Sequence, residues 1–240
     1  MLTFHNPHHA RHAGQQEMFR GKMGPCHEVP ARLDHVLAEL QRRPVGPLRT
    51  PDLDSPAAQA ALDAALARVH SPRYLDFLAS AWDEWVAMNP ANAALDALPS
   101  VWPLPNRHGF RTDVLPHNFA ARLGVFSFDS GTPLTAGSWP AARAGAACAL
   151  AAAQALRDGG HTRVAVLDVD YHHGNGTQTI FYERADVLTV SIHGDPATEY
   201  PFFLGHADER GAGAGTGFNL NLPLPRGTGY ATWRAALDTA

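Results

Sequence analysis

Cysteine is nearly absent from this chain of 240 residues, which carries only Cys26 and Cys148. The two lie far apart in the sequence and form no Cys-x-x-Cys pair, so neither a disulfide framework nor a zinc site built from thiolates is indicated. Such sparse use of cysteine fits a reducing compartment. We therefore expect a cytoplasmic protein.

Blocks of basic residues and long apolar runs are missing as well. The 19 lysines and arginines are spread along the chain and the formal net charge is -4, which argues against direct binding of nucleic acid. The N-terminal stretch MLTFHNPHHARHAG is rich in histidine where a secretory signal would need an apolar core. The alanine-rich stretch around residue 150 is bounded by arginines and poor in large side chains, so we expect no membrane span and a soluble protein.

What remains has the composition of a globular protein. Hydrophobic residues make up 45% of the chain, which is enough for a sizeable core in one large α/β domain or two small ones. Apolar residues at helical spacing predict four helices, two of which open with Ser-Pro, a favourable pair for a helix start. The predicted ranges are 29–43, 55–70, 71–88 and 139–160. The segment between the third and fourth helix is rich in proline and loops, and only 123–129 has the pattern of a strand.

The second half of the chain has the pattern of a parallel β-α-β unit. Two apolar strands, 162–170 and 186–193, are separated by a loop and a short helix, 177–183. Strands that are apolar throughout are typical of parallel sheets, because helices cover both faces. A strand at 219–225 and a helix from 227 onward follow. We therefore predict an α/β fold in which a parallel sheet carries helices on both faces.

Polar residues stand at the carboxyl ends of the two strands, where parallel sheets bind ligands. They are Asp168, Asp170 and His172 after the first strand, and Ser191, His193 and Asp195 after the second. Residues two apart on an extended chain share a face, so Asp170 and His172 can meet one metal ion. A catalytic zinc usually has three protein ligands, and one is missing from this stretch. Packing alone does not explain the buried acids, and we interpret the stretch as a metal site.

Several neighbouring residues leave alternatives open. Asp168 could accept hydrogen bonds from backbone amides and a histidine, or it could bind a second, structural cation. Asn175 could orient a nearby imidazole. The aromatic residues that follow the second strand could line a pocket or simply pack within their loop. The glycine-rich segment 211–217 lacks the lysine of a phosphate-binding loop, and we interpret it as a flexible loop.

The motif LDVDYHHGNGTQ, residues 167–178, resembles the zinc-dependent deacetylases of the arginase-deacetylase fold. This family includes histone deacetylases and bacterial acetylpolyamine amidohydrolases. Further similar stretches run through most of the chain, among them RVHSPRYLDFL, VLTVSIHGD and EYPFFLGHADERGAGAGTGFNLNLPLP. The last of these is most similar to the acetylpolyamine amidohydrolase branch.

The resemblance implies a cofactor and a set of site residues. It implies Zn²⁺ bound by Asp170 and His172, K⁺ bound by Asp168 and Ser191, supporting positions at His173 and Asn175, substrate contacts from Phe202, Phe203 and Asp129, and Arg32 near an acetate exit. In the family, zinc polarises the amide carbonyl and activates a water molecule. A pair of histidines transfers protons, and a tyrosine hydroxyl stabilises the oxyanion.

The chain departs from the family pattern in three places. The Pro-Gly-His-His segment with the proton-transferring histidines is absent, and the helices that flank it in the family run together at Ala153 and Gln154. The aspartate that provides the third zinc ligand and the Gly-Gly-Tyr segment belong to positions beyond residue 240. The opening LTF, residues 2–4, is predicted as a short strand, and the stretch NPHHA, residues 6–10, follows it and does not replace the histidine pair. We therefore expect one deacetylase-like domain over 1–240, with an internal gap near 153–154 and a C-terminal truncation.

Two hypotheses for function follow. The first is a zinc-dependent amidohydrolase that removes acetyl or related acyl groups from a small acylated amine or from acetyl-lysine. The second is a shortened, non-catalytic relative that binds metal weakly or acts only with a partner, since two protein ligands lower the affinity for zinc. A homo-oligomer is compatible with both.

Overall fold

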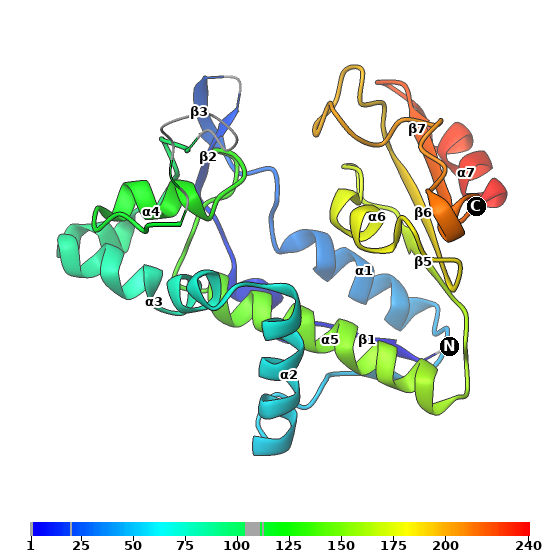
Figure 1. Cartoon of the computed structure of the whole chain (residues 1–240), viewed down its shortest axis with the longest axis horizontal. Helices are drawn as coiled ribbons and strands as arrows, with labels where there is room; N and C mark the ends of the chain where they lie inside the picture. Colours follow the sequence, from blue (N-terminus) through cyan, green and yellow to red (C-terminus); the bar gives the residue numbers. More distant parts are fainter. Residues whose placement is uncertain (1, 20, 104–110, 112) are drawn as a thin grey trace. The chain divides into compact units, whose positions relative to one another are not determined.

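The computed structural model describes residues 2–19, 21–103, 111 and 113–240, and divides the chain into two compact units. Unit 1 comprises residues 1–155 and unit 2 comprises residues 156–240. Figure 1 labels the elements of both units. The prediction of a single domain over 1–240 stays a prediction.

Unit 1 is mainly helical. Its strands form two pairs: β1 (Thr3–Phe4) lies parallel to β4 (Leu48–Arg49), and β2 (Gln16–Phe19) forms an antiparallel hairpin with β3 (Lys22–Pro25). Its helices are α1 (Ala31–Arg42), α2 (Pro56–Val69), α3 (Pro72–Met88), α4 (Phe119–Val125) and α5 (Ser138–Asp158), with short 3₁₀ helices at His9–Arg11 and Pro90–Ala94. The four helices predicted from the sequence are confirmed to within a few residues at their ends.

Serine caps explain where two of these helices begin. The hydroxyl oxygen of Ser55 accepts the backbone N–H of Ala58 at 3.2 Å, and that of Ser71 accepts the N–H of Tyr74 at 3.4 Å. Each satisfies an amide that has no partner inside the helix, and the proline that follows lacks an amide to satisfy.

The core of unit 1 lies between α3, α4 and the segments beside them. Its buried side chains are Phe77, Ala81, Ala97, Phe119, Leu123 and Leu134. Trp82 and Trp85 pack against this cluster. The predicted strand at 123–129 is wrong, because Asn118 caps a helix that continues to Val125. Phe119 and Leu123 stand four residues apart and bury one face of that helix.

Helix α5 runs without a break through Ala153 and Gln154. Ala141, Ala144 and Ala147 are its buried residues, and their three-residue spacing places them on one face. After the helix ends at Asp158, Gly160 turns the chain with a φ of +74°. The position near 153–154, where the sequence predicts a gap relative to the family, therefore lies within a continuous helix, and the gap itself stays a prediction.

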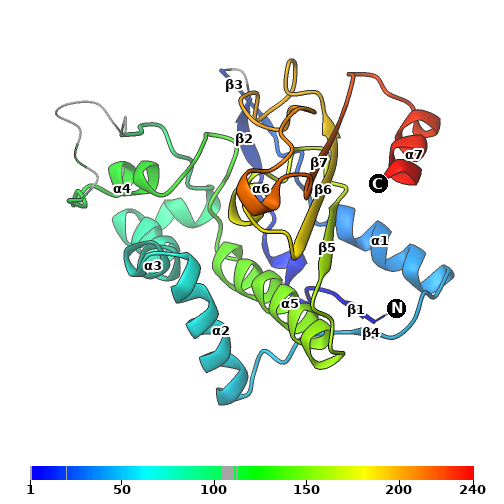
Figure 2. The ribbon, with the colours of Figure 1, turned by 45° about the vertical axis from the view of Figure 1, so that its right-hand side comes forward.

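Unit 2 contains a parallel sheet in the order β5-β6-β7. Strand β5 spans Val164–Asp168, β6 spans Val187–Gly194 and β7 spans Asn219–Leu224, with α6 (Asn175–Phe181), a 3₁₀ helix at Gly213–Gly215 and α7 (Tyr230–Thr239). Figure 2 shows α6 against one face of the sheet and α7 against the other. The central strand β6 is almost entirely buried. The predicted parallel sheet with helices on both faces is confirmed.

The register of the sheet places three polar residues side by side. Asp168 pairs with Ser191, and Ser191 pairs with Asn221 on β7. Strand β5 pairs with β6 along one edge, and within the described residues no strand pairs with its other edge. The outward side chains of Leu167 and Val169, at the end of β5, are about half exposed.

Among the helices that the structure describes, none combines the length and the apolar character that a membrane crossing requires.

Candidate active site at the carboxyl ends of the parallel strands

Two successive turns carry Asp170 and His172 away from β5. The carboxylate of Asp168 accepts the backbone N–H of Asp170 at 3.0 Å, and the carboxylate of Asp170 accepts the N–H of His172 at 2.8 Å. The predicted strand therefore ends two residues early, at Asp168, because these side chains compete with the sheet for the backbone amides. Aspartate at every second position thus builds the turns as well as supplying carboxylates.

Asp170 and His172 lie close enough to bind one ion. The imidazole Nδ1 of His172 is 3.7 Å from Oδ1 of Asp170, and both side chains are about two-fifths exposed. Zinc takes oxygen and nitrogen ligands at about 2.0 to 2.2 Å in a tetrahedron, which separates two ligand atoms by roughly 3.4 Å. The pair fits two positions of such a site. Within the described residues, no group of three His, Cys, Asp or Glu side chains surrounds a common point.

Asp168 and Ser191 line one small cavity. A cavity of about 10 Å³ is lined by Asp168, Ser191, His173 and neighbouring residues of β6 and β7. Gly174 passes so close to Asp168 that a Cβ atom at this position would overlap the carboxylate. Glycine at 174 is therefore required for the chain to turn over Asp168.

The Ser191 hydroxyl donates a hydrogen bond to His193. Nε2 of His193 lies 2.9 Å from the carbonyl oxygen of Gly205, which can only accept, so this nitrogen carries the proton. Nδ1 then accepts from the Ser191 hydroxyl at 2.9 Å. The oxygen of Ser191 accepts the N–H of Gly174 at 3.3 Å. Burial lowers the pKa of His193, which keeps its imidazole neutral.

His173 is buried beside this pair, with 4% of its surface exposed. Its Nε2 contacts Oε1 of Gln178 at 3.0 Å, and its Nδ1 is buried with no hydrogen-bond partner among the described residues. Burial also lowers its pKa. Asn175 begins α6, and its backbone N–H donates to the carbonyl of His173 at 2.8 Å. Orientation of an imidazole by the Asn175 side chain stays a prediction.

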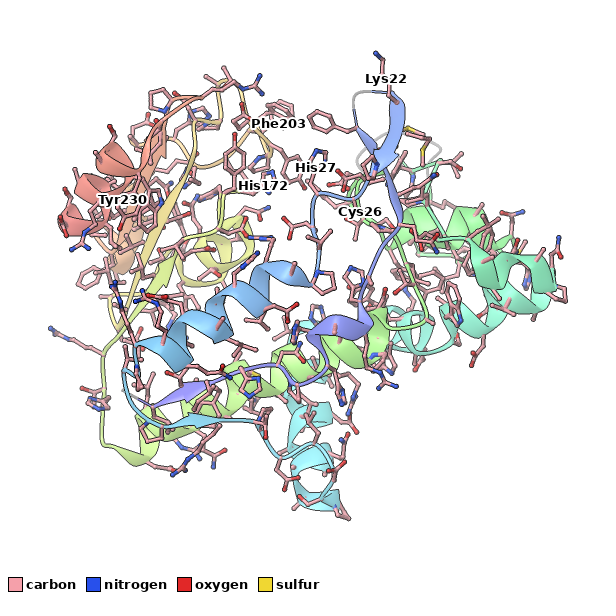
Figure 3. The ribbon with its side chains drawn as sticks, turned by 180° about the vertical axis from the view of Figure 1, so that it is seen from behind. Lys22, Cys26, His27, His172, Phe203 and Tyr230 are labelled. Atoms are coloured by element: carbon pink, nitrogen blue, oxygen red, sulfur yellow. The ribbon has the colours of Figure 1, made fainter. Side chains whose placement is uncertain are left out.

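An aromatic loop, defined here as residues 200–204, stands next to His172. The ring of Tyr200 meets His172 edge-on at a centroid distance of 5.5 Å, and Phe202 contacts both Tyr200 and Phe203. Phe203 is 86% exposed. Figure 3 shows Phe203 and His172 in unit 2. The aromatic loop therefore reaches His172 through Tyr200, and the predicted substrate contacts of Phe202 and Phe203 stay predictions.

A hollow of about 340 Å³ lies between the strand ends and the start of α7. It is lined by Asp170, Tyr171, His193, Arg226, Tyr230, Trp233 and neighbouring residues. Arg226 forms an ion pair with the buried carboxylate of Glu199 at 2.7 Å. This pair ties the end of β7 to the segment that precedes the aromatic loop.

Two predicted site residues belong to unit 1. The carboxylate of Asp129 accepts the N–H of Gly131 at 2.8 Å and contacts the Thr132 hydroxyl at 3.3 Å, forming a turn. Arg32, on α1, forms an ion pair with Glu28. Their predicted contacts with substrate and acetate stay predictions.

Sequence reasoning missed a hydrogen-bonded polar network that joins α6, β7 and the segment between the aromatic loop and β7. Its members are Gln178, Glu209, Asn219 and Asn221, all buried or half-buried. The alternation NLNLPLP carried a signal, because two asparagines on the same face of a buried strand need hydrogen-bond partners.

Comparison with known proteins finds relatives of similar sequence over all or most of this chain. The sequence model of one protein family, the histone deacetylase domain, matches residues 147–240. Acetylpolyamine amidohydrolase 2 of Pseudomonas aeruginosa is 41% identical over 279 positions, which cover 100% of this chain and 77% of the relative. The acetylpolyamine amidohydrolase of Mycoplana ramosa is 33% identical, with 98% of this chain and 76% of the relative covered.

A solved structure agrees with these matches. The acetylpolyamine aminohydrolase of Burkholderia pseudomallei has a TM-score of 0.74 and 34% identity, covering 100% of this chain and 76% of that one. Likeness of sequence and of fold therefore extends over both units. The chain belongs to the histone deacetylase family of hydrolases, in the branch of the acetylpolyamine amidohydrolases.

Proposed function

We propose that the protein is a zinc-dependent amidohydrolase that removes acetyl or related acyl groups from acylated amines. The observation that carries the proposal is the 3.7 Å separation of Asp170 Oδ1 and His172 Nδ1 at the carboxyl end of β5, beside the aromatic loop. Family membership supports the reaction class, because the relatives are named amidohydrolases.

Asp170 and His172 would hold the zinc ion. When bound, zinc supplies Lewis acidity, which polarises an amide carbonyl and lowers the pKa of a water molecule. The chain's own residues prepare this position. The carboxylate of Asp170 is oriented by the N–H of His172, and the edge of the Tyr200 ring restricts rotation of the imidazole.

Asp168 and Ser191 would hold a structural cation such as K⁺. The Ser191 hydroxyl donates its hydrogen bond to Nδ1 of His193, so its oxygen retains acceptor capacity next to the Asp168 carboxylate. Hard cations of this kind prefer oxygen ligands. Such an ion would fix the two strand ends from which the zinc ligands and the aromatic loop extend.

The substrate would be a small acylated amine or an acetyl-lysine side chain. Phe202 and Phe203 belong to the aromatic loop, which contacts His172 through Tyr200, and they present exposed apolar ring surface, as a slender aliphatic arm requires. Asp129 would contact the substrate amide. The names of the relatives favour an acetylpolyamine.

The proposal is tested by zinc content together with hydrolysis. Purified protein is assayed by elemental analysis and with two substrates, a fluorogenic acetyl-lysine peptide and an N-acetylated diamine. We expect about one zinc per chain and turnover that falls more than about a hundredfold in His172→Ala, because one of its ligands is gone. His206→Ala is the matched control, since this exposed histidine also belongs to unit 2.

The outcomes separate the two hypotheses for function. Turnover that survives in His172→Ala would refute the assigned ligand. Zinc bound in proportion to His172, without turnover of either substrate, would favour the non-catalytic relative.

A further inference from the structure

The side chain of Gln178 has a fixed orientation in a buried network behind the aromatic loop. Its Oε1 accepts from the amide groups of Asn219 at 2.9 Å and of Asn221 at 2.8 Å. Its Nε2 donates to the carboxylate of Glu209 at 2.5 Å. Because Oε1 faces donors and Nε2 faces an acceptor, the reversed amide orientation would lose all three hydrogen bonds.

Glu209 joins this network to a single backbone position. Both oxygens of its carboxylate lie within hydrogen-bonding distance of the N–H of Gly205, at 3.0 and 3.2 Å. The backbone carbonyl of Glu209 accepts from Asn219 at 2.7 Å. Burial raises the pKa of Glu209, but the hydrogen bonds from Gln178 and from backbone amides outweigh it, so the pKa lies below its ordinary value. The group therefore acts as a carboxylate that only accepts.

Both backbone polar groups of Gly205 are hydrogen-bonded, and two imidazole rings pack closely against it. Its φ is +100°, and a Cβ atom at this position would lie 2.7 Å from Nε2 of His193 and 2.8 Å from Cγ of His173. Its carbonyl accepts from His193 at 2.9 Å and its amide donates to Glu209. The chain leaving the aromatic loop is thus anchored through one residue, by one imidazole and one carboxylate.

We propose that Glu209 is a positioning residue, which holds the N–H of Gly205 and thereby keeps the aromatic loop beside His172. The role of the loop as a substrate wall rests on the proposed function, whereas the anchoring is a property of unit 2 alone. Without this carboxylate, the amides of Gly205 and Gln178 lose a buried acceptor, and the local structure opens to recover water as a partner.

The arrangement of donors and acceptors predicts that a second substitution can compensate for the first. In Gln178→Glu, the new carboxylate at position 178 faces the carboxylate of Glu209 in place of the amide that donated to it, so the two groups repel each other. Adding Glu209→Gln restores one amide and one carboxylate in reversed order. The carboxylate at 178 then accepts from the asparagines and from the new amide at 209, whose oxygen accepts from Gly205.

The experiment measures hydrogen exchange by mass spectrometry in a metal-free buffer containing EDTA. We compare a peptide covering Gly205 with one covering β6 in four variants: Glu209→Ala, Gln178→Glu, the reversed pair and Asp208→Ala. We expect exchange at Gly205 to accelerate at least about tenfold in the first two. It should return to within about threefold of wild type in the reversed pair and stay unchanged in Asp208→Ala, the exposed neighbour.

Three results would overturn the proposal: unchanged exchange at Gly205 in Glu209→Ala, acceleration there that β6 shares equally, or no recovery in the reversed pair. If Glu209→Ala does not fold, the comparison of Gln178→Glu with the reversed pair decides alone. Since no metal and no substrate take part, a failure of the proposed hydrolysis would leave this result unaffected.

Discussion

Asp168 and Asp170 each bind the amide two residues farther on, and this local rule explains how the sequence builds the site. The acids and His172 were predictable from the sequence because their spacing is short. Glu209 was not, because its partners Gln178 and Asn219 stand 31 and 10 residues away from it. A carboxylate in a glycine-rich segment has no local pattern that distinguishes it from an exposed one.

At the same residue scale, Gly205→Ala should strongly destabilise the protein. The new Cβ would overlap His193 and His173, and the alanine would be held at an unfavourable positive φ. We therefore expect a loss of about 2 to 4 kcal/mol in the free energy of unfolding. Gly217→Ala is the control, because its φ of +86° imposes a similar backbone penalty, while an added Cβ would have no atom of the described part of the chain within 4 Å. It should cost only about 1 kcal/mol. Equal losses in urea unfolding would contradict the packing argument.

Among elements, those with a strong periodic pattern were predictable and the weakly patterned ones were not. The helices opened by Ser-Pro and the parallel unit follow from caps and apolar strands. The hairpin β2-β3 was missed because most of its side chains are exposed and show no alternation. The strand predicted at 123–129 failed because the Asn118 cap extends a helix through apolar residues that either structure could bury.

For helix α3, replacing its cap should have a measurable cost. Ser71→Ala removes the acceptor of the Tyr74 amide and should lower the free energy of unfolding by about 1 kcal/mol. Ser71→Asp should restore stability, because aspartate accepts the same amide and its charge favours a helix N-terminus. The measurement is urea unfolding followed by circular dichroism at 222 nm. Equal stability of Ser71→Ala and wild type would show that the cap contributes nothing.

For the whole molecule, the fold class and the family were predictable, because the strand pattern and the motif at 167–178 persist over long stretches. The predicted junction at 153–154, the cytoplasmic location and the homo-oligomer stay predictions. So does the role of Asp129, because its carboxylate is defined only by its own turn.

Acidification should destabilise the protein in two separate windows. Burial holds the pKa of His12 below 6.5, and Arg226 holds the pKa of Glu199 below 4.5. Both pKa values are lower in the folded state, so the unfolded chain binds more protons as the pH falls below each ordinary value. Stability is therefore fully present above these values and declines below them.

Urea midpoints, measured in EDTA, test both windows. The midpoint should fall between pH 7.5 and 5.5, and fall less in His12→Gln. It should fall again below pH 4.5, and fall less in Glu199→Gln. A midpoint that rises on acidification, or slopes that neither variant changes, would contradict the assignment.

The edge of β5 that pairs with no described strand affects how the protein associates in concentrated solution. Among the described residues, β5 pairs with a strand along one edge only, and Leu167 and Val169 at its end are about half exposed, so its other edge is a template for a strand of another molecule. We expect the scattered-light intensity of concentrated solutions to rise more steeply than the protein concentration. Leu167→Lys should suppress the excess, because a buried ammonium group in a stacked strand is too costly. Solubility of this protein would then be limited by one strand rather than by its net charge.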